Sequence, residues 1–257
     1  MKYLVSLALA LAVAGATPVT PVTPVKHVYP QGIDVSSYQP NVNWTTVKKN
    51  DIAFAYIKAT EGTCHVHLPT FNSQYTGAAK AGLIRGGYHF AHPNVSSGAT
   101  QAKYFLAHGG GCSEDGITLP GALDIECNPS GPKCYGLSAP AMVSWIKDFS
   151  NTYKAATGRY PVIYTTTDWW KDCTGNSATF GSTNPLWIAN YASTIGTLPA
   201  GWKETSFWQY AHSGPNPGDA ILWNGDLAGL KRYTFCYLAR RNTLIITLVL
   251  NSMAHGP

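Results

Sequence analysis

The chain has 257 residues, of which 45% are hydrophobic, 12% are aromatic and only 12% are charged. This hydrophobic content is enough for a sizeable core and excludes a disordered chain. Charged residues are scarce, because they usually make up about a quarter of a soluble domain. The formal net charge is +5, but no run of Lys or Arg indicates a nucleic-acid-binding protein. Few charges and many aromatic residues are typical of secreted proteins that handle carbohydrates.

The first 16 residues have the three parts of a secretory signal peptide. Lys2 supplies the positive charge, Leu4 to Val13 form a short apolar stretch, and Ala14 to Ala16 are small residues suited to cleavage. The apolar stretch is too short to span a membrane. Residues 17–31 contain a Pro/Thr repeat and are predicted to form a linker or pro-segment.

Short segments rich in aromatic and β-branched residues predict eight strands, each bounded by Gly, Pro, Asn or Asp. In chain order they are 32–38, 52–59, 84–91, 121–127, 161–166, 185–191, 205–211 and 220–227. Apolar residues at helical spacing predict helices over 42–50, 70–82, 99–108, 138–157 and 168–173.

This order predicts five strand–helix units followed by three strands. Strand–helix alternation implies parallel strands, and eight strands suggest closure into a modified TIM-like α/β barrel. We therefore expect one barrel domain over residues 32–232. Residues 233–257 contain the seven-residue run LIITLVL, too short to cross a membrane, and are read as an apolar tail of unknown role.

Six cysteines lie after the signal peptide, which predicts disulfide bonds in an exported chain. Six cysteines allow 15 pairings, so their spacing does not assign them. The segment from Cys64 to His67 is read as a loop and not as a metal site, because no second group of ligands lies at zinc-site spacing. Two N-glycosylation sequons begin at Asn43 and Asn94.

The main candidates for chemistry are acidic residues embedded in apolar strands, where a charge is costly unless it is paired or used. Asp124 and Glu126 are two residues apart, so a strand would direct both to one face. Repulsion and burial should then raise the pKa of one carboxyl while the other stays ionised, as glycosidic bond cleavage requires. Asp34 and Asp226 lie on the first and last predicted strands, which closure would make neighbours.

The sequence lacks the motifs of several other reaction classes. The sequence has no G-x-S-x-G nucleophile turn, no phosphate-binding loop and no H-E-x-x-H pair. Aromatic residues near the strand ends could pack on sugar rings.

Together, the motifs GIDVSSYQ, YIKATEG, GGYHFA, LDIE, PVIYTT, LWIANY and FWQY resemble glycoside hydrolase family 25, the muramidase-type lysozymes, and in particular its secreted fungal branch. The resemblance covers about residues 30–232. It implies a barrel of five strand–helix units followed by three strands. It also implies cleavage of the β-1,4 bond between N-acetylmuramic acid and N-acetylglucosamine in peptidoglycan, without a metal or organic cofactor.

The resemblance also implies roles for individual residues. Glu126 resembles the general acid, and Asp124 resembles the carboxylate that stabilises the reacting centre, either directly or by orienting the substrate's 2-acetamido group. The residues that match substrate-lining positions are Asp34, Asp226, Tyr88, Tyr164 and Trp208.

The family pattern further suggests that Cys134 and Cys173 are bonded. The remaining four cysteines, Cys64, Cys112, Cys127 and Cys236, are additional to that pattern, and the apolar tail has no recognised counterpart.

We therefore expect a secreted, extracellular and monomeric muramidase that acts on peptidoglycan and binds neither nucleic acid nor membrane. Two alternatives remain at this point. One is a carbohydrate-binding barrel without activity. The other is a chitinase, although residues 119–126 lack the earlier acids of the chitinase D-x-x-D-x-D-x-E strand.

Overall fold

A computed structural model describes residues 29–63, 65–66 and 69–236. The predicted signal peptide, most of the predicted linker, Cys64, His67 and the segment from residue 237 onward lie outside the described residues. Within them, no helix is long and apolar enough to cross a membrane.

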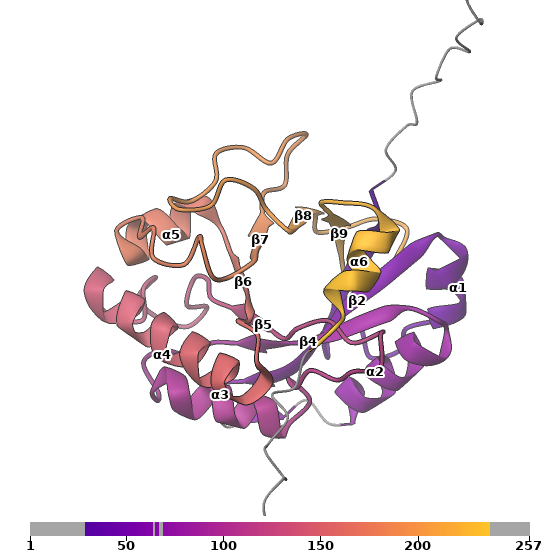
Figure 1. The fold of residues 1–257 in the computed structure, drawn as a ribbon, viewed down its shortest axis with the longest axis horizontal. Helices are drawn as coiled ribbons and strands as arrows, with labels where there is room; N and C mark the ends of the chain where they lie inside the picture. Colours follow the sequence, from indigo (N-terminus) through magenta and orange to yellow (C-terminus); the bar gives the residue numbers. More distant parts are fainter. Residues whose placement is uncertain (1–28, 64, 67–68, 237–257) are drawn as a thin grey trace, which may run out of the picture.

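The described chain forms a closed barrel with helices around it (Figure 1). The strands are β1 (Gln31–Val35), β2 (Ile52–Glu61), β3 (His65–Val66), β4 (Ile84–Phe90), β5 (Ala122–Asp124), β6 (Val162–Thr165), β7 (Leu186–Ala189), β8 (Phe207–Ala211) and β9 (Asp219–Trp223). The helices are α1 (Trp44–Lys49), α2 (Thr70–Lys80), α3 (Gly98–Ala107), α4 (Ala139–Thr157), α5 (Thr167–Thr174) and α6 (Leu227–Tyr233).

The element order confirms five strand–helix units followed by three strands. The sheet order is β1-β9-β8-β7-β6-β5-β4-β2-β3, and pairing of β1 with β2 closes the barrel. The two-residue strand β3 was not predicted; among the described strands it pairs with the end of β2. β1 to β8 run parallel around the barrel apart from β3, whereas β9 is antiparallel to both β8 and β1.

Strand alternation divides the apolar residues into two cores. Inside the barrel, large aromatic side chains fill the space, and Tyr56 stacks on Trp187 with ring centroids 4.8 Å apart. Outside it, the other faces of the strands pack against the helices. The apolar residues whose spacing predicted the helix over 138–157 lie here, because Met142, Trp145, Ile146, Phe149 and Tyr153 of α4 are all buried. Figure 1 shows α4 beside α3, against which it packs.

The C-terminal boundary differs from the prediction. Residues 227–233 form α6, which the sequence pattern did not indicate, so a boundary at 232 would cut this helix. Leu230 and Tyr233 pack into the inner core, and Arg159 donates hydrogen bonds to the carbonyl oxygens of Tyr233 and Phe235. Because Arg159 precedes β6, this helix covers the end of the barrel at which the parallel strands begin.

Candidate active site

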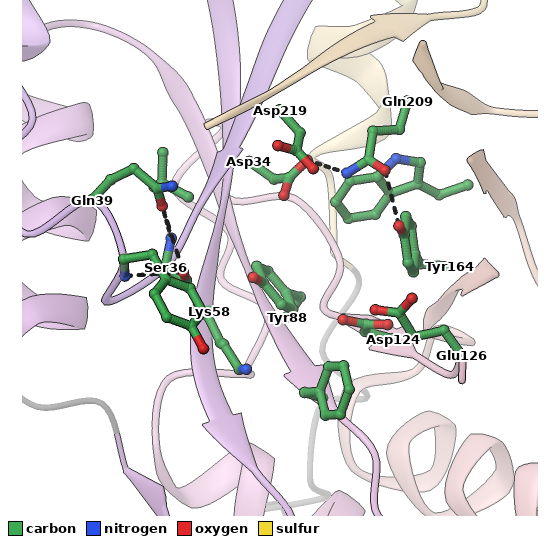
Figure 2. A pocket seen from close by; sticks show the side chains of 14 residues that line it. Asp34, Ser36, Gln39, Lys58, Tyr88, Asp124, Glu126, Tyr164, Gln209 and Asp219 are labelled. Atoms are coloured by element: carbon green, nitrogen blue, oxygen red, sulfur yellow. Dashed lines mark hydrogen bonds between the residues drawn. The ribbon is translucent and has the colours of Figure 1, made fainter. Parts of the chain in front are cut away.

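A cavity of about 230 Å³ opens at the carboxyl ends of the parallel strands (Figure 2). Barrel enzymes place their active sites at this end. Its polar lining includes Asp34, Ser36, Gln39, Lys58, Tyr88, Asp124, Glu126, Tyr164, Gln209 and Asp219.

Asp124 and Glu126 both face this cavity, as their spacing predicts. Asp124 is the last residue of β5, and Glu126 follows it. Ile125 between them is fully buried among the outer core residues. The extended pairing continues past the strand, because the Ile125 amide donates to the Tyr164 carbonyl oxygen at 3.0 Å. The backbone of β5 and β6 therefore aims both carboxyls into one opening, where Figure 2 shows them side by side.

The environment raises the pKa of both carboxyls. Burial raises the pKa of Asp124 well above its usual range, and the neighbouring Glu126 raises it further. Burial also raises the pKa of Glu126, although the Lys58 ammonium opposes this effect. Within the described residues, Asp124 Oδ1 is buried without a hydrogen-bond partner. Such a coupled pair retains a proton at a pH where isolated carboxyls are ionised.

Asp34 and Asp219 form a second acidic group at the mouth. They are partners in the β1–β9 register. Burial, followed by the charge of Asp219, raises the pKa of Asp34 well above its usual range. Gly218, with φ of +78°, brings the turn so close that a Cβ there would collide with the Asp34 carbonyl oxygen. Only glycine fits this approach, so Gly218 helps to set Asp219 beside Asp34.

The expectation that Asp226 would line the site is wrong. Its side chain caps α6 and accepts a hydrogen bond from the Gly229 amide at 2.6 Å. Because β9 runs antiparallel, its first residue, Asp219, reaches the mouth and the residues after its end lie at the opposite side. The sequence held a signal for this direction: residues 212–218 form a short Gly- and Pro-containing connection, which suits an antiparallel hairpin.

Gln209, which sequence reasoning missed, connects the two sides of the mouth. Its Nε2 donates to Asp34 Oδ2 at 2.7 Å, and its Oε1 accepts from the hydroxyls of Tyr164 and Tyr191, each at 2.9 Å. Because both tyrosine hydroxyls donate to the same amide atom, that atom is Oε1, and Nε2 is the atom that faces Asp34. An amide in the otherwise apolar FWQY strand was the available signal.

The predicted aromatic residues divide into two groups. Tyr88 and Tyr164 line the cavity. Trp208 does not: its Nε1 donates to the Asn190 carbonyl oxygen at 2.9 Å, and its ring packs against the outer core. Alternation along β8 explains the difference, because neighbouring Gln209 takes the inward position.

Lys58 is a cation in the cavity lining that sequence reasoning also missed. Its Nζ lies 2.6 Å from Glu61 Oε2 and 4.5 Å from the centroid of the Phe90 ring. Glu61 in turn contacts His92 Nε2 at 2.9 Å. Lys58 and His92 lower the Glu61 pKa to about 2, against the opposing effect of burial. This ionised carboxylate therefore anchors Lys58 opposite the acidic pair.

The loop after β5 is fastened to α5. Cys134 bonds to Cys173, as the resemblance implied, with Cα atoms 5.2 Å apart. Lys133 also forms an ion pair with Asp172 at 2.5 Å. A second disulfide joins Cys112 and Cys236, while Cys127 is exposed and is not bonded to any other described cysteine.

The remaining candidates lie outside the cavity. Asn43 is exposed and caps α1 by accepting from the Thr46 amide at 3.0 Å. Asn94 is exposed between β4 and α3. Among the described residues, no cluster of three or more His, Cys, Asp or Glu side chains could hold a metal ion.

Comparison with known proteins agrees with this arrangement. The family model for glycosyl hydrolases family 25 matches residues 33–219. An N,O-diacetylmuramidase from Arthroderma benhamiae is 55% identical over 203 residues, covering 79% of this chain and 86% of that protein. Lysozyme M1 from Streptomyces globisporus is 50% identical over 205 residues, covering 78% and 69% of the two chains.

Solved structures show the same fold. The family GH25 lysozyme from Aspergillus fumigatus has a TM-score of 0.79 and 51% identity, covering 81% of this chain and all of that one. A muramidase from Acremonium alcalophilum has a TM-score of 0.78 and 56% identity, covering 80% and 98%. The chain belongs to glycosyl hydrolases family 25.

Proposed function

We propose that this protein is a secreted lysozyme that hydrolyses the β-1,4 bond between N-acetylmuramic acid and N-acetylglucosamine in bacterial peptidoglycan. The observation that carries the proposal is the convergence of Asp124 and Glu126 on one cavity, with the pKa of both carboxyls raised. The muramidase and lysozyme names of its relatives identify the substrate class.

Glu126 acts as the general acid. It contributes to the first cavity and also to a second cavity on its other side, so its carboxyl lies where a glycan can pass. A proton on Glu126 is transferred to the glycosidic oxygen as the bond breaks.

Asp124 stabilises the positive charge that develops on the sugar ring. It lines the first cavity and is absent from the lining of the second. This placement suits a carboxylate beside the anomeric carbon, acting on it directly or through the 2-acetamido group. Asp34, Asp219, Tyr88 and Tyr164 complete the wall of this cavity.

We expect the protein to act outside the cell as a monomer. The features of residues 1–16 support export, and the two disulfides suit an oxidising environment. The positive net charge favours weak, salt-dependent association with anionic cell walls.

The test compares the wild type with Glu126→Gln on purified peptidoglycan. Removing the acid should reduce turnover by about 10²–10⁴-fold, while the melting temperature stays close to that of the wild type. Mass spectrometry should show that the wild type releases fragments with N-acetylmuramic acid at the new reducing end.

Asp226→Asn is the matched control, because this acid caps α6 away from the mouth and Asn retains the capping oxygen. Its turnover should equal that of the wild type. Unchanged turnover in Glu126→Gln would refute the catalytic assignment. Binding without fragment release by the wild type would indicate a non-catalytic barrel, and preferential release from chitin would indicate a chitinase.

A further inference from the structure

The strands β8 and β9 have no helix in the connections that lead to them. The segments from β7 to β8 and from β8 to β9, which the structure describes throughout, consist of loops and turns. Outward residues of β6 and β7, such as Ile163 and Ile188, are fully buried in the outer core. By contrast, Trp208 on β8 and Leu222 on β9 are only partly buried. These two are partners in the β8–β9 register, so they form one apolar strip on the outside of the barrel.

A small groove of about 120 Å³ lies over this strip. Segments far apart in the sequence form it: Tyr29 precedes β1, and Ile195 belongs to the loop after β7. Tyr29 is exposed. The complete lining consists of Tyr29, Ile195, Thr205, Trp208, Leu222, Trp223 and Asn224.

Three polar groups in this lining are already bonded within the protein. Trp208 Nε1 donates to a backbone carbonyl oxygen at 2.9 Å, and Asn224 Nδ2 donates to the Thr205 carbonyl oxygen at 2.8 Å. Thr205 Oγ1 lies 3.0 and 2.6 Å from two backbone carbonyl oxygens. A sugar requires polar partners for its many hydroxyls, whereas this groove presents mainly aromatic and aliphatic surface. The groove therefore suits an apolar partner better than a saccharide.

The segment that leads into the groove has a matching repeat. Residues 17–25 read TPVTPVTPV, and residues 26–28 connect them to Tyr29, which is itself a wall of the groove. A polyproline II helix has three residues per turn, so this repeat would place Pro, Val and Thr on three separate faces, two of them apolar. Grooves lined by aromatic residues bind Pro-rich segments in this conformation, because a preformed helix loses little entropy on binding.

The length of this segment also fits. β9 lies between β1 and β8, and neighbouring strands are about 4.8 Å apart, so the groove is about 10 Å across. A polyproline II helix rises about 3.1 Å per residue, so three or four residues cover this distance. Counting back from Tyr29, Val25 would reach the side formed by Trp208 and Ile195. Weak contacts are sufficient for a tethered segment, because a short link gives an effective concentration of about the millimolar range.

From these observations we propose that residues 17–28 dock along this groove as a polyproline II segment, with Val22 and Val25 directed towards Trp208 and Ile195. The segment then covers β8 and β9 on the face that helices cover on other strands of the barrel. The proposal does not depend on the proposed function, because the groove lies outside the barrel and its lining includes neither Asp124 nor Glu126.

The test measures how fast trypsin cleaves after Lys26 in a chain that begins at Thr17. Residues 17–28 contain no other Lys or Arg, so this one cleavage reports on the segment. A docked segment must leave the groove before trypsin can cut it, so the rate follows the undocked fraction. Mass spectrometry of the intact chain measures the rate under conditions in which the barrel stays folded.

Replacing both valines, Val22→Thr with Val25→Thr, should speed this cleavage by at least about tenfold, because a hydroxyl is costly in an apolar groove. Both substitutions lie before β1, so the melting temperature should change little. The matched control is Thr20→Ser with Thr23→Ser, which alters another face of the same repeat. Its cleavage rate should equal that of the wild type.

On the side of the groove, Leu222→Gln should accelerate cleavage to a similar extent without adding a tryptic site. Combining it with the valine substitutions should add little, because both changes remove the same contact. Ala220→Gln is the matched control, since Ala220 is also an outward residue of β9 but does not line the groove. Ile195→Gln takes the place of Leu222→Gln if the latter lowers the melting temperature.

The proposal is overturned if the wild type is cleaved as fast as the valine variant, or if the groove substitutions leave the rate unchanged. It is also overturned if Ala220→Gln accelerates cleavage as much as Leu222→Gln does. Size-exclusion chromatography tests the other occupant: a dimer that Leu222→Gln dissociates would assign the groove to a second copy of this chain and not to residues 17–28.

Discussion

The mouth of the barrel and the interface of β4 with α3 and α4 both enclose ionisable side chains, but their hydrogen bonding differs. His89 on β4 is fully buried, and both of its ring nitrogens have partners: Thr60 Oγ1 lies 2.8 Å from Nδ1, and Gln101 Oε1 lies 2.9 Å from Nε2. Because Gln101 Oε1 can only accept, Nε2 carries the proton and Nδ1 accepts from Thr60. At the mouth, by contrast, Asp124 Oδ1 has no partner among the described residues.

This difference separates a polar group buried for structure from one buried for chemistry. The His89 ring is also packed against Phe105 and Phe149. A satisfied buried group helps to specify the core, whereas a carboxyl left without partners retains its capacity to interact with a substrate.

The two regions should also respond to pH with opposite sign. Burial lowers the His89 pKa to about 4, so its contribution to stability is present above the ordinary pKa of about 6.5 and is lost as the pH falls towards 4. Burial raises the pKa of Asp34 and Asp124, so these groups favour the fold when protonated and destabilise it as the pH rises above their ordinary range.

The largest effect is expected for Asp124→Asn. Activity on peptidoglycan should fall by about 10²–10³-fold, as for other losses of transition-state stabilisation. The same change should raise the free energy of unfolding at pH 7 by about 0.5–2 kcal/mol, because it removes a buried charge. Urea unfolding at pH 7 and pH 4 should show a smaller gain at the lower pH. A variant that is both inactive and less stable at pH 7 would contradict the comparison.

A smaller effect, on stability alone, is expected for His89→Ala. Loss of the packed ring and of two hydrogen bonds should cost about 2–3 kcal/mol of unfolding free energy at pH 7. The difference from the wild type should narrow at pH 4, where the wild type has lost the contribution of its neutral imidazole. The specific activity of the folded fraction should be retained. Equal destabilisation at both pH values would refute the role assigned to His89.

The smallest effect is expected for Gln209→Met, which preserves length but removes the bonds to Asp34, Tyr164 and Tyr191. We expect kcat/KM to fall by about tenfold, or about 1.4 kcal/mol. Tyr191→Phe, which removes one of these bonds, should lose less. If both variants match the wild type in steady-state kinetics, Gln209 does not organise the mouth.

The sequence allowed the barrel and the acidic pair to be predicted for a shared reason. Strand–helix alternation and the two-residue spacing of Asp124 and Glu126 are local patterns, and local patterns fix the face on which a side chain lies. The acidic residue near β9 was misassigned, because Asp226 was predicted to line the mouth and Asp219 does so. The direction of a strand depends on the connection that leads into it, and the prediction did not take the short turn after β8 into account.

Gln209 and Lys58 were missed for a different reason. The amide of Gln209 was visible in an apolar strand, but its importance arises from contact with a strand distant in sequence: 175 positions separate Gln209 from Asp34. Lys58 meets the acidic pair only in the folded barrel, where all three side chains line one cavity. The helix α6 was overlooked because its few apolar residues, such as Leu230, complete a core formed by other elements. Such roles depend on tertiary packing, which local sequence patterns do not reveal.

The disulfide between Cys112 and Cys236 has a practical consequence. It ties the residues after α6 to the loop before β5, at the end of the barrel opposite the cavities. Both bonded cysteines therefore lie at the back of the enzyme. An affinity handle or a solid support attached to this face would leave the front of the molecule free to approach an insoluble, bulky polymer.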